Sequence, residues 1–210
     1  MLTTVERTTV DTAWWSSPDW QRYEALASVT LSREQELREA HWSTRVIDLT
    51  RTEGQRWHDL RKSYRQLIAI ATRTLCIEPV LPAVVPEFMK MHALVAGRQT
   101  RPTETWELMA DWVRTGSLRV MGARDAYGWC GFVGTYRWNR WSYYGHSVTT
   151  RPNINAALVW RAMNDVVELG ATHYEVGWQG HATDDKGAAI EFFRRGFGGT
   201  DWPFAASETR

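Results

Sequence analysis

The sequence has few of the features that mark secreted, metal-stapled or membrane-spanning proteins. Its 210 residues include two cysteines, Cys76 and Cys130, and no Cys-x-x-Cys pair, so a disulfide framework and a zinc ribbon are excluded. No apolar run approaches the roughly 20 residues that cross a bilayer. The first fifteen residues lack the basic start and apolar block of a secretory signal. We therefore expect a cytoplasmic protein with no membrane span and no metal site.

Lysine is also scarce, with 3 Lys among 25 basic residues, and the formal net charge is +1. A chain so close to neutral has no overall field that draws it to nucleic acid or to anionic lipid. Arginine binds phosphate and carboxylate through two parallel hydrogen bonds and stacks on rings, which favours a ligand of that kind. A GC-rich genome would produce the same bias, and both readings stay open. The 13 Trp and the 43% hydrophobic content allow a sizeable core.

The chain divides into a polar arm, residues 1–42, and a regularly patterned single domain, residues 43–210. A charged helix is predicted over residues 32–39, and Trp14, Trp15, Trp20 and Trp42 are expected to pack the arm onto the body. Hydrophobic periodicity and Gly or Pro boundaries then predict alternating elements. Strands are expected at 44–49, 118–123, 129–137, 141–149, 172–178 and from 197, and helices at 55–72, 87–96, 103–114, 154–169 and 188–195.

These elements predict an α+β fold. Its mixed sheet has an antiparallel meander followed by a β-α-β crossover, with helices on both faces. Motifs along the chain fit the same order, at residues 60–65, 91–106, 143–147, 174–177 and 192–199, the last reading Phe-Phe-Arg-Arg-Gly-Phe-Gly-Gly. Together they resemble the FemAB-like branch of the GNAT N-acyltransferase superfamily.

The resemblance implies transfer of an acyl or aminoacyl group to an amine, without a tightly bound cofactor. The implied donor is aminoacyl-tRNA, with acyl-CoA as the second choice. Two departures matter. Familiar FemAB enzymes carry two GNAT-like domains where this chain has room for one, so a homodimer is conceivable by analogy. The basic residue of the last motif is Arg194 here and usually Lys in the family.

The predicted junction between strand 141–149 and helix 154–169 contains no glycine. Acetyl-CoA enzymes of this superfamily bind the pyrophosphate on a Gly-rich loop at this place, where exposed N–H groups and the helix dipole attract phosphate. Here the loop holds Pro152, which has no N–H. The sequence therefore argues against acetyl-CoA, although Arg151 could replace part of the missing cradle.

Acyl transfer to an amine requires a group that accepts the amine proton, groups that stabilise the oxyanion, and binding that holds the two reactants in the correct orientation. His146 lies in the segment that, as the resemblance implies, diverges from its parallel neighbour, and it is a candidate base, or else a hydrogen-bonded strand histidine. Tyr144 either binds substrate and donates a proton or packs. Glu175 is a base or amine ligand, or half of a pair with an Arg. Arg194 stabilises the oxyanion or holds phosphate, unless it is a helix-end cation.

Basic and aromatic residues supply the candidate substrate-binding set. Three positive charges on one predicted helix face suggest a phosphate-bearing ligand or a solvated surface, and two arginines precede a helix start, where anions bind favourably. A following tryptophan could stack on a base or belong to the core. With the loop arginine, the set is Arg61, Lys62, Arg65, Arg98, Arg101, Trp106 and Arg151.

The resulting prediction is an acyltransferase whose acceptor amine belongs to a molecule that carries phosphate or carboxylate. A nucleotide-linked sugar or peptide, an amino acid and a modified nucleotide or base all fit, and tRNA is a possible partner. Two alternatives lack catalysis. One is a nucleic-acid-binding module that uses the Arg clusters and Trp residues as stacking platforms. The other is a degenerate GNAT-like scaffold.

Overall fold

A computed structural model describes residues 2–4, 11–13, 43–179 and 184–203. The predicted arm helix and the four tryptophans assigned to the arm lie outside these residues. The described part of the arm holds two short antiparallel strands, β1 (Leu2–Thr4) and β2 (Asp11–Ala13), which pair with each other.

The body contains the mixed α/β architecture that the sequence predicts. Its seven strands have the order β4-β5-β6-β7-β8-β3-β9. β4 pairs with β5, β5 with β6, β6 with β7 and β3 with β9 in antiparallel fashion, and β7 pairs with β8 in parallel. The strands are β3 (Ser43–Asp48), β4 (Cys76–Pro79), β5 (Leu118–Asp125), β6 (Gly128–Trp138), β7 (Trp141–Thr149), β8 (His173–Gln179) and β9 (Thr200–Pro203).

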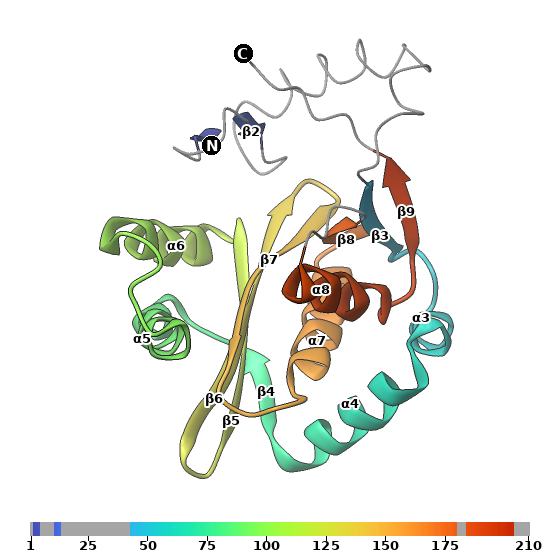
Figure 1. Cartoon of the computed structure of the whole chain (residues 1–210), viewed down its shortest axis with the longest axis horizontal. Coiled ribbons are helices and arrows are strands. Elements are labelled where there is room, and N and C mark those ends of the chain that lie inside the picture. The colour runs from blue at the N-terminus through green and yellow to red at the C-terminus, as the bar shows by residue number, and fades with distance from the viewer. Residues whose placement is uncertain (1, 5–10, 14–42, 180–183, 204–210) are drawn as a thin grey trace. The chain divides into compact units, whose positions relative to one another are not determined.

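Residues 47–175 with 196–198 form one compact unit of the chain. In this unit α5 and α6 cover one face of the meander β5–β6–β7, and α4 and α7 lie on the other face (Figure 1). The elements outside the sheet are α3 (Glu53–Asp59), α4 (Lys62–Thr74), the 3-10 turn η1 (Pro82–Val84), α5 (Val85–Ala96), α6 (Thr103–Thr115) and α7 (Asn155–Glu168).

The core under α5 and α6 is built from large apolar side chains at helix and strand spacing. Phe88 stacks on Phe132 with 5.2 Å between ring centroids and meets Trp106 edge-on at 5.3 Å. Met109 and Leu118 are fully buried beside them. This packing fixes the loop between α5 and α6 over the sheet.

The second compact unit contains the ends of the body, including α8 (Asp185–Arg195). Within it β3 and β9 pair in antiparallel register from Ser43↔Pro203 to Val46↔Thr200. Arg45 reinforces this pair, because its guanidinium donates to Asp201 Oδ1 at 2.7 Å and to the Gly199 carbonyl at 3.0 Å.

Two local predictions are wrong. The helix expected over residues 55–72 is two helices, because Leu60 and Arg61 have extended ψ angles and the Arg61 N–H donates to the Gly196 carbonyl at 2.9 Å. Asparagine is a favoured N-cap, which predicts Asn153 as the cap of the helix expected at 154–169, but Asn153 has a left-handed φ of 66° and the cap residue of α7 is Ile154.

Candidate functional site

The centre of β7 contains a bulge. His146 pairs with Gly134 and Tyr144 pairs with Thr135, so Gly145 is an extra residue without a counterpart on β6. A Cβ atom at position 145 would lie 2.4 Å from the Tyr136 ring, which only glycine avoids. An extra residue changes which side chains share a face of a strand. Tyr144 therefore contacts residues on the α7 side, and His146 contacts residues on the α5–α6 side.

His146 lies in a hydrogen-bonded cluster on the α5–α6 side. Its Nδ1 is 2.9 Å from Arg101 Nη2, and its Nε2 is 2.7 Å from the Tyr136 hydroxyl. A guanidinium can only donate. Nδ1 must therefore be the unprotonated nitrogen, and the hydrogen of the neutral ring is on Nε2, where it donates to the Tyr136 oxygen.

The electrostatics of the cluster agree with a neutral His146. Burial, followed by the positive charge of Arg101, lowers the pKa of His146 to about 3. Burial raises the pKa of Tyr136 to about 12, so its hydroxyl stays protonated. In this geometry both ring nitrogens of His146 are already engaged, so the ring is poorly placed to accept a proton at neutral pH.

Arg101 enters the cluster from the loop between α5 and α6. Its guanidinium lies over the Trp106 ring, with 5.6 Å from Cζ to the ring centroid. Its Nη1 is buried and has no hydrogen-bond partner among the described residues. No ion pair of the described chain contains Arg101, and burial lowers its pKa. The cluster thus holds a half-buried positive charge without a counter-ion among the described residues.

A second polar group lies on the α7 side of the bulge. The Tyr144 hydroxyl is 2.5 Å from Ser147 Oγ, and Asn155 Nδ2 donates to the Tyr144 oxygen at 3.3 Å. Asn155 is the first residue of α7, and its Oδ1 is buried without a partner among the described residues. This end of the strand therefore carries hydroxyl groups and an unused amide acceptor.

β7 and β8 run parallel at the start of both strands. Trp141 pairs with His173, Ser142 with Tyr174 and Tyr143 with Glu175, and β7 continues from Tyr144 to Thr149 alongside β6. Glu175 is half-buried, and its pairing with Tyr143 places it close to the bulge at Gly145.

The other predicted site residues of the 47–175 unit do not join these groups. Arg194 belongs to the second unit, where its guanidinium packs on Gly177, the φ of which is 103°. Arg151 is paired with Asp125. Arg65 donates to the His58 carbonyl at 3.0 Å. The remaining three basic residues of the set are Arg61, whose guanidinium lies over the Tyr64 ring, and the exposed Lys62 and Arg98.

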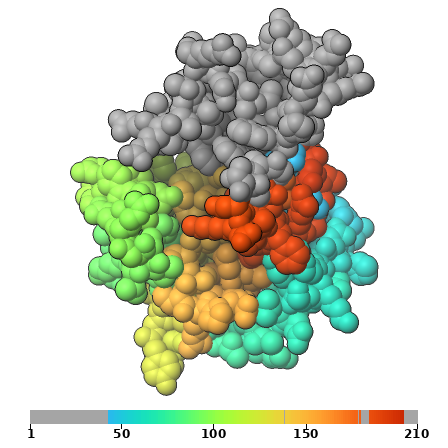
Figure 2. Space-filling view, viewed as in Figure 1, coloured from blue at the N-terminus to red at the C-terminus, as the bar shows by residue number. Residues whose placement is uncertain are grey.

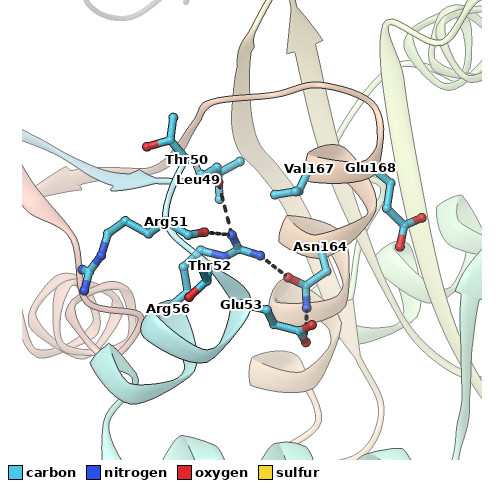
Figure 3. Close-up of a pocket in the computed structure, with 9 residues that line it drawn as sticks. All are labelled: Leu49, Thr50, Arg51, Thr52, Glu53, Arg56, Asn164, Val167 and Glu168. Carbon is cyan, nitrogen blue, oxygen red and sulfur yellow. Dashed lines mark hydrogen bonds between the residues drawn. The ribbon is translucent and has the colours of Figure 1, made fainter.

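A cavity of about 310 Å³ opens between the β3–α3 loop and the C-terminal half of α7 (Figure 3). Arg56, only 5% exposed, points into this junction and donates to Asn164 Oδ1 at 2.9 Å and to the carbonyls of Leu49 and Arg51. Sequence reasoning did not single out Arg56. With every Nη group bonded to the protein, Arg56 ties the loop to α7.

Three members of the two clusters also escaped the sequence analysis as site residues: Tyr136, Ser147 and Asn155. His92, whose Nδ1 is 3.0 Å from Thr100 Oγ1, packs edge-on against the Trp106 ring next to the Arg101 cluster. Gly145 between Tyr144 and His146 was the available signal, since an isolated glycine in a strand often marks a bulge. Among the described residues no group of three His, Cys, Asp or Glu side chains could hold a metal ion. None of the described helices is long and apolar enough to cross a membrane.

Solved structures share the architecture of the chain, although no family model and no curated protein matches its sequence. FemX superimposes with a TM-score of 0.65 and 9% identity, over 94% of this chain and 78% of FemX. The C-terminal domain of a putative lysylphosphatidylglycerol synthetase from Agrobacterium fabrum superimposes with a TM-score of 0.56 and 14% identity, over 81% of this chain and 61% of that domain. The aminoglycoside N-acetyltransferase AAC(6')-Iy in complex with CoA superimposes with a TM-score of 0.50 and 7% identity, over 65% of this chain and 94% of the acetyltransferase.

The chain has a FemAB-like GNAT fold. The fold expected from the motif order is thereby confirmed. The chain spans about three fifths of the synthetase domain that it matches. In this fold the bulge of β7 directly follows the parallel pairing of β7 with β8, and its surroundings are the candidate active site.

Proposed function

We propose that the protein is an acyltransferase that moves an acyl or aminoacyl group onto the amine of an acceptor bearing phosphate or carboxylate. One observation carries the proposal: in a FemAB-like GNAT fold, the bulge at Gly145 of β7 directly follows the parallel pair Tyr143↔Glu175, so Glu175 and Tyr144 lie beside the bulge. The similar structures include FemX, a putative lysylphosphatidylglycerol synthetase and an acetyltransferase that binds CoA, so the proposal follows their common chemistry.

In the proposed reaction the amine nitrogen attacks the carbonyl carbon of the donor. The bond from that carbon to the leaving oxygen or sulfur then breaks, the amine loses a proton and the leaving group gains one. Glu175, which pairs with Tyr143 next to the bulge, is the proposed acceptor of the amine proton. Tyr144 is the proposed proton donor, because its hydroxyl is already bonded to Ser147 and Asn155.

Aminoacyl-tRNA is the preferred donor of the proposal. The loop before α7 has no glycine, and its one arginine, Arg151, is engaged with Asp125. Both features weaken the loop as a pyrophosphate cradle of the kind that binds CoA. Acyl-CoA is the second donor, and the basic residues of α4 are proposed to bind donor phosphates.

The test combines a donor panel with one matched pair of variants. The full chain is incubated with labelled aminoacyl-tRNA, acetyl-CoA or longer acyl-CoA, and with amines that carry phosphate or carboxylate, such as amino acids and amino-sugar nucleotides. Transfer of label is expected from at least one donor. Tyr144→Phe is expected to lower its rate by about 10²-fold or more, as loss of a general acid does.

The control is Tyr127→Phe. Tyr127 is 95% exposed in the β5–β6 turn, the yellow projection at the lower edge of Figure 2, so the same loss of a hydroxyl there is expected to leave the rate unchanged. Absence of transfer from every donor, combined with equal thermal stabilisation by charged and uncharged tRNA, would contradict the proposal and favour a nucleic-acid-binding module.

A further inference from the structure

Arg56 and Arg101, both in the 47–175 unit, differ in how their positive charge is satisfied. Arg56 is buried, its guanidinium donates to two carbonyls and to Asn164, and Glu53 and Asp48 contribute favourable negative charge. Arg101 is half-buried, and its guanidinium has one hydrogen-bond partner among the described residues, the neutral ring of His146. A cation whose guanidinium is partly withdrawn from water without a counter-ion costs folding free energy, so its presence indicates a role in binding a ligand.

His146 orients Arg101 without neutralising it. Its Nδ1 accepts from Nη2, its Nε2–H donates to Tyr136, and the Tyr136 ring is in turn held against Gly145 by the bulge. On the other side the guanidinium is supported by the face of Trp106, which is 3% exposed. The guanidinium plane is therefore fixed from two directions, and the Nη1 donors are left unused.

We propose that Arg101 binds an oxyanion of the acceptor, a carboxylate or a phosphate, through Nη1, and that His146 acts as a neutral positioning residue for Arg101. A planar fork with two N–H groups matches either oxyanion. That the oxyanion belongs to the acceptor rests on the proposed function. The binding of the oxyanion itself rests on the cluster alone.

The test measures binding of two simple probes, inorganic phosphate and acetate, to the purified full chain at neutral pH by NMR titration, without any donor. Binding of at least one probe is expected. Phosphate alone would identify the oxyanion as a phosphate, and acetate alone as a carboxylate. Arg101→Gln and Arg101→Lys are expected to weaken binding at least tenfold, the second because lysine keeps the charge and loses the fork. The control Arg114→Gln removes an exposed arginine that is paired with Asp111 on α6, and it is expected to bind as the parent does.

Two changes at position 146 separate positioning from proton transfer. In His146→Gln the amide oxygen can accept from Arg101 while the amide N–H donates to Tyr136, so probe binding is expected within about threefold of the parent. In His146→Leu neither bond forms, and binding is expected to fall at least tenfold. If His146→Leu does not fold, retained probe binding in His146→Gln together with loss of binding in Arg101→Lys would also show that His146 positions Arg101 and does not transfer a proton.

The proposal is overturned if neither probe binds the parent chain, if Arg101→Gln binds like the parent, or if His146→Gln loses binding as completely as Arg101→Gln. The acyltransferase proposal is read separately, by transfer of label. Probe binding without transfer of label would support the anion site and contradict the proposed acyltransferase. Transfer of label without probe binding would support the acyltransferase and contradict the anion site.

Discussion

His146→Gln also makes a quantitative prediction about stability. The imidazole has a pKa near 6.5 in an unfolded chain and about 3 in the folded protein, because burial and then Arg101 disfavour its charged form. Between these two values the unfolded state binds a proton that the folded state does not. The free energy of unfolding therefore falls as the pH drops from 6.5 toward 3, and the contribution of His146 is fully present only above pH 6.5.

The size of the effect follows from the two pKa values. A difference of one pKa unit between the folded and unfolded states corresponds to about 1.4 kcal/mol, so His146 changes the free energy of unfolding by up to about 5 kcal/mol between pH 6.5 and pH 3. At pH 5 this residue alone lowers the free energy of unfolding by about 2 kcal/mol relative to its value well above pH 6.5. Glutamine has the same hydrogen-bonding pattern as the neutral ring and does not titrate, so His146→Gln is expected to lack this part of the pH dependence.

The measurement is urea unfolding of the parent chain and His146→Gln at pH 8 and pH 5. The parent is expected to lose about 2 kcal/mol more than the variant between these pH values. The other titrating neighbours, His92 above all, are present in both proteins and cancel in the comparison. Equal losses would refute the reasoning, because they would mean that the folded ring protonates as readily as a free histidine.

Three further changes test the packing around the site. Gly145→Ala is expected to destabilise the fold by about 1–3 kcal/mol in urea unfolding, because the new Cβ would overlap the Tyr136 ring; an unchanged midpoint would contradict the bulge geometry. Trp106→Ala removes a buried ring and is expected to cost about 3–5 kcal/mol by the same assay, whereas a loss under 1 kcal/mol would place the ring at the surface. Asp165→Asn weakens a two-bond pair with Arg119, both bonds under 2.9 Å, and a fall in melting temperature is expected that shrinks in high salt.

Much of the fold was predictable because its boundaries are local. Gly97 and Gly116, expected to end their helices, have φ angles of 68° and 81° at the C-caps of α5 and α6. The strand predicted at 141–149 matches β7 from Trp141 to Thr149. A left-handed glycine and a run of strand-forming residues act within a few positions, so they can be recognised without knowledge of distant contacts.

The failures depend on contacts between distant segments. The break between α3 and α4 occurs at Leu60, which is buried, and at Arg61, which donates to Gly196 135 residues later in the chain. Nothing in the local periodicity marks this point. β4 was missed for a related reason, because Cys76–Pro79 contains a proline and becomes a strand by pairing with β5. Proline is tolerated at such an edge position.

The bulge at Gly145 explains why the candidate site was predicted by residue and not by arrangement. A regular strand would place Tyr144 and His146 on one face, where both could act on the same substrate. The extra residue places the Tyr144 hydroxyl beside Asn155 of α7 and the His146 ring beside Arg101 of the α5–α6 loop. β7 thus contributes polar side chains to both faces of the sheet. We propose that proton transfer occurs on the face that carries the hydroxyl groups, and that the face that carries Arg101 binds the charged group of the acceptor.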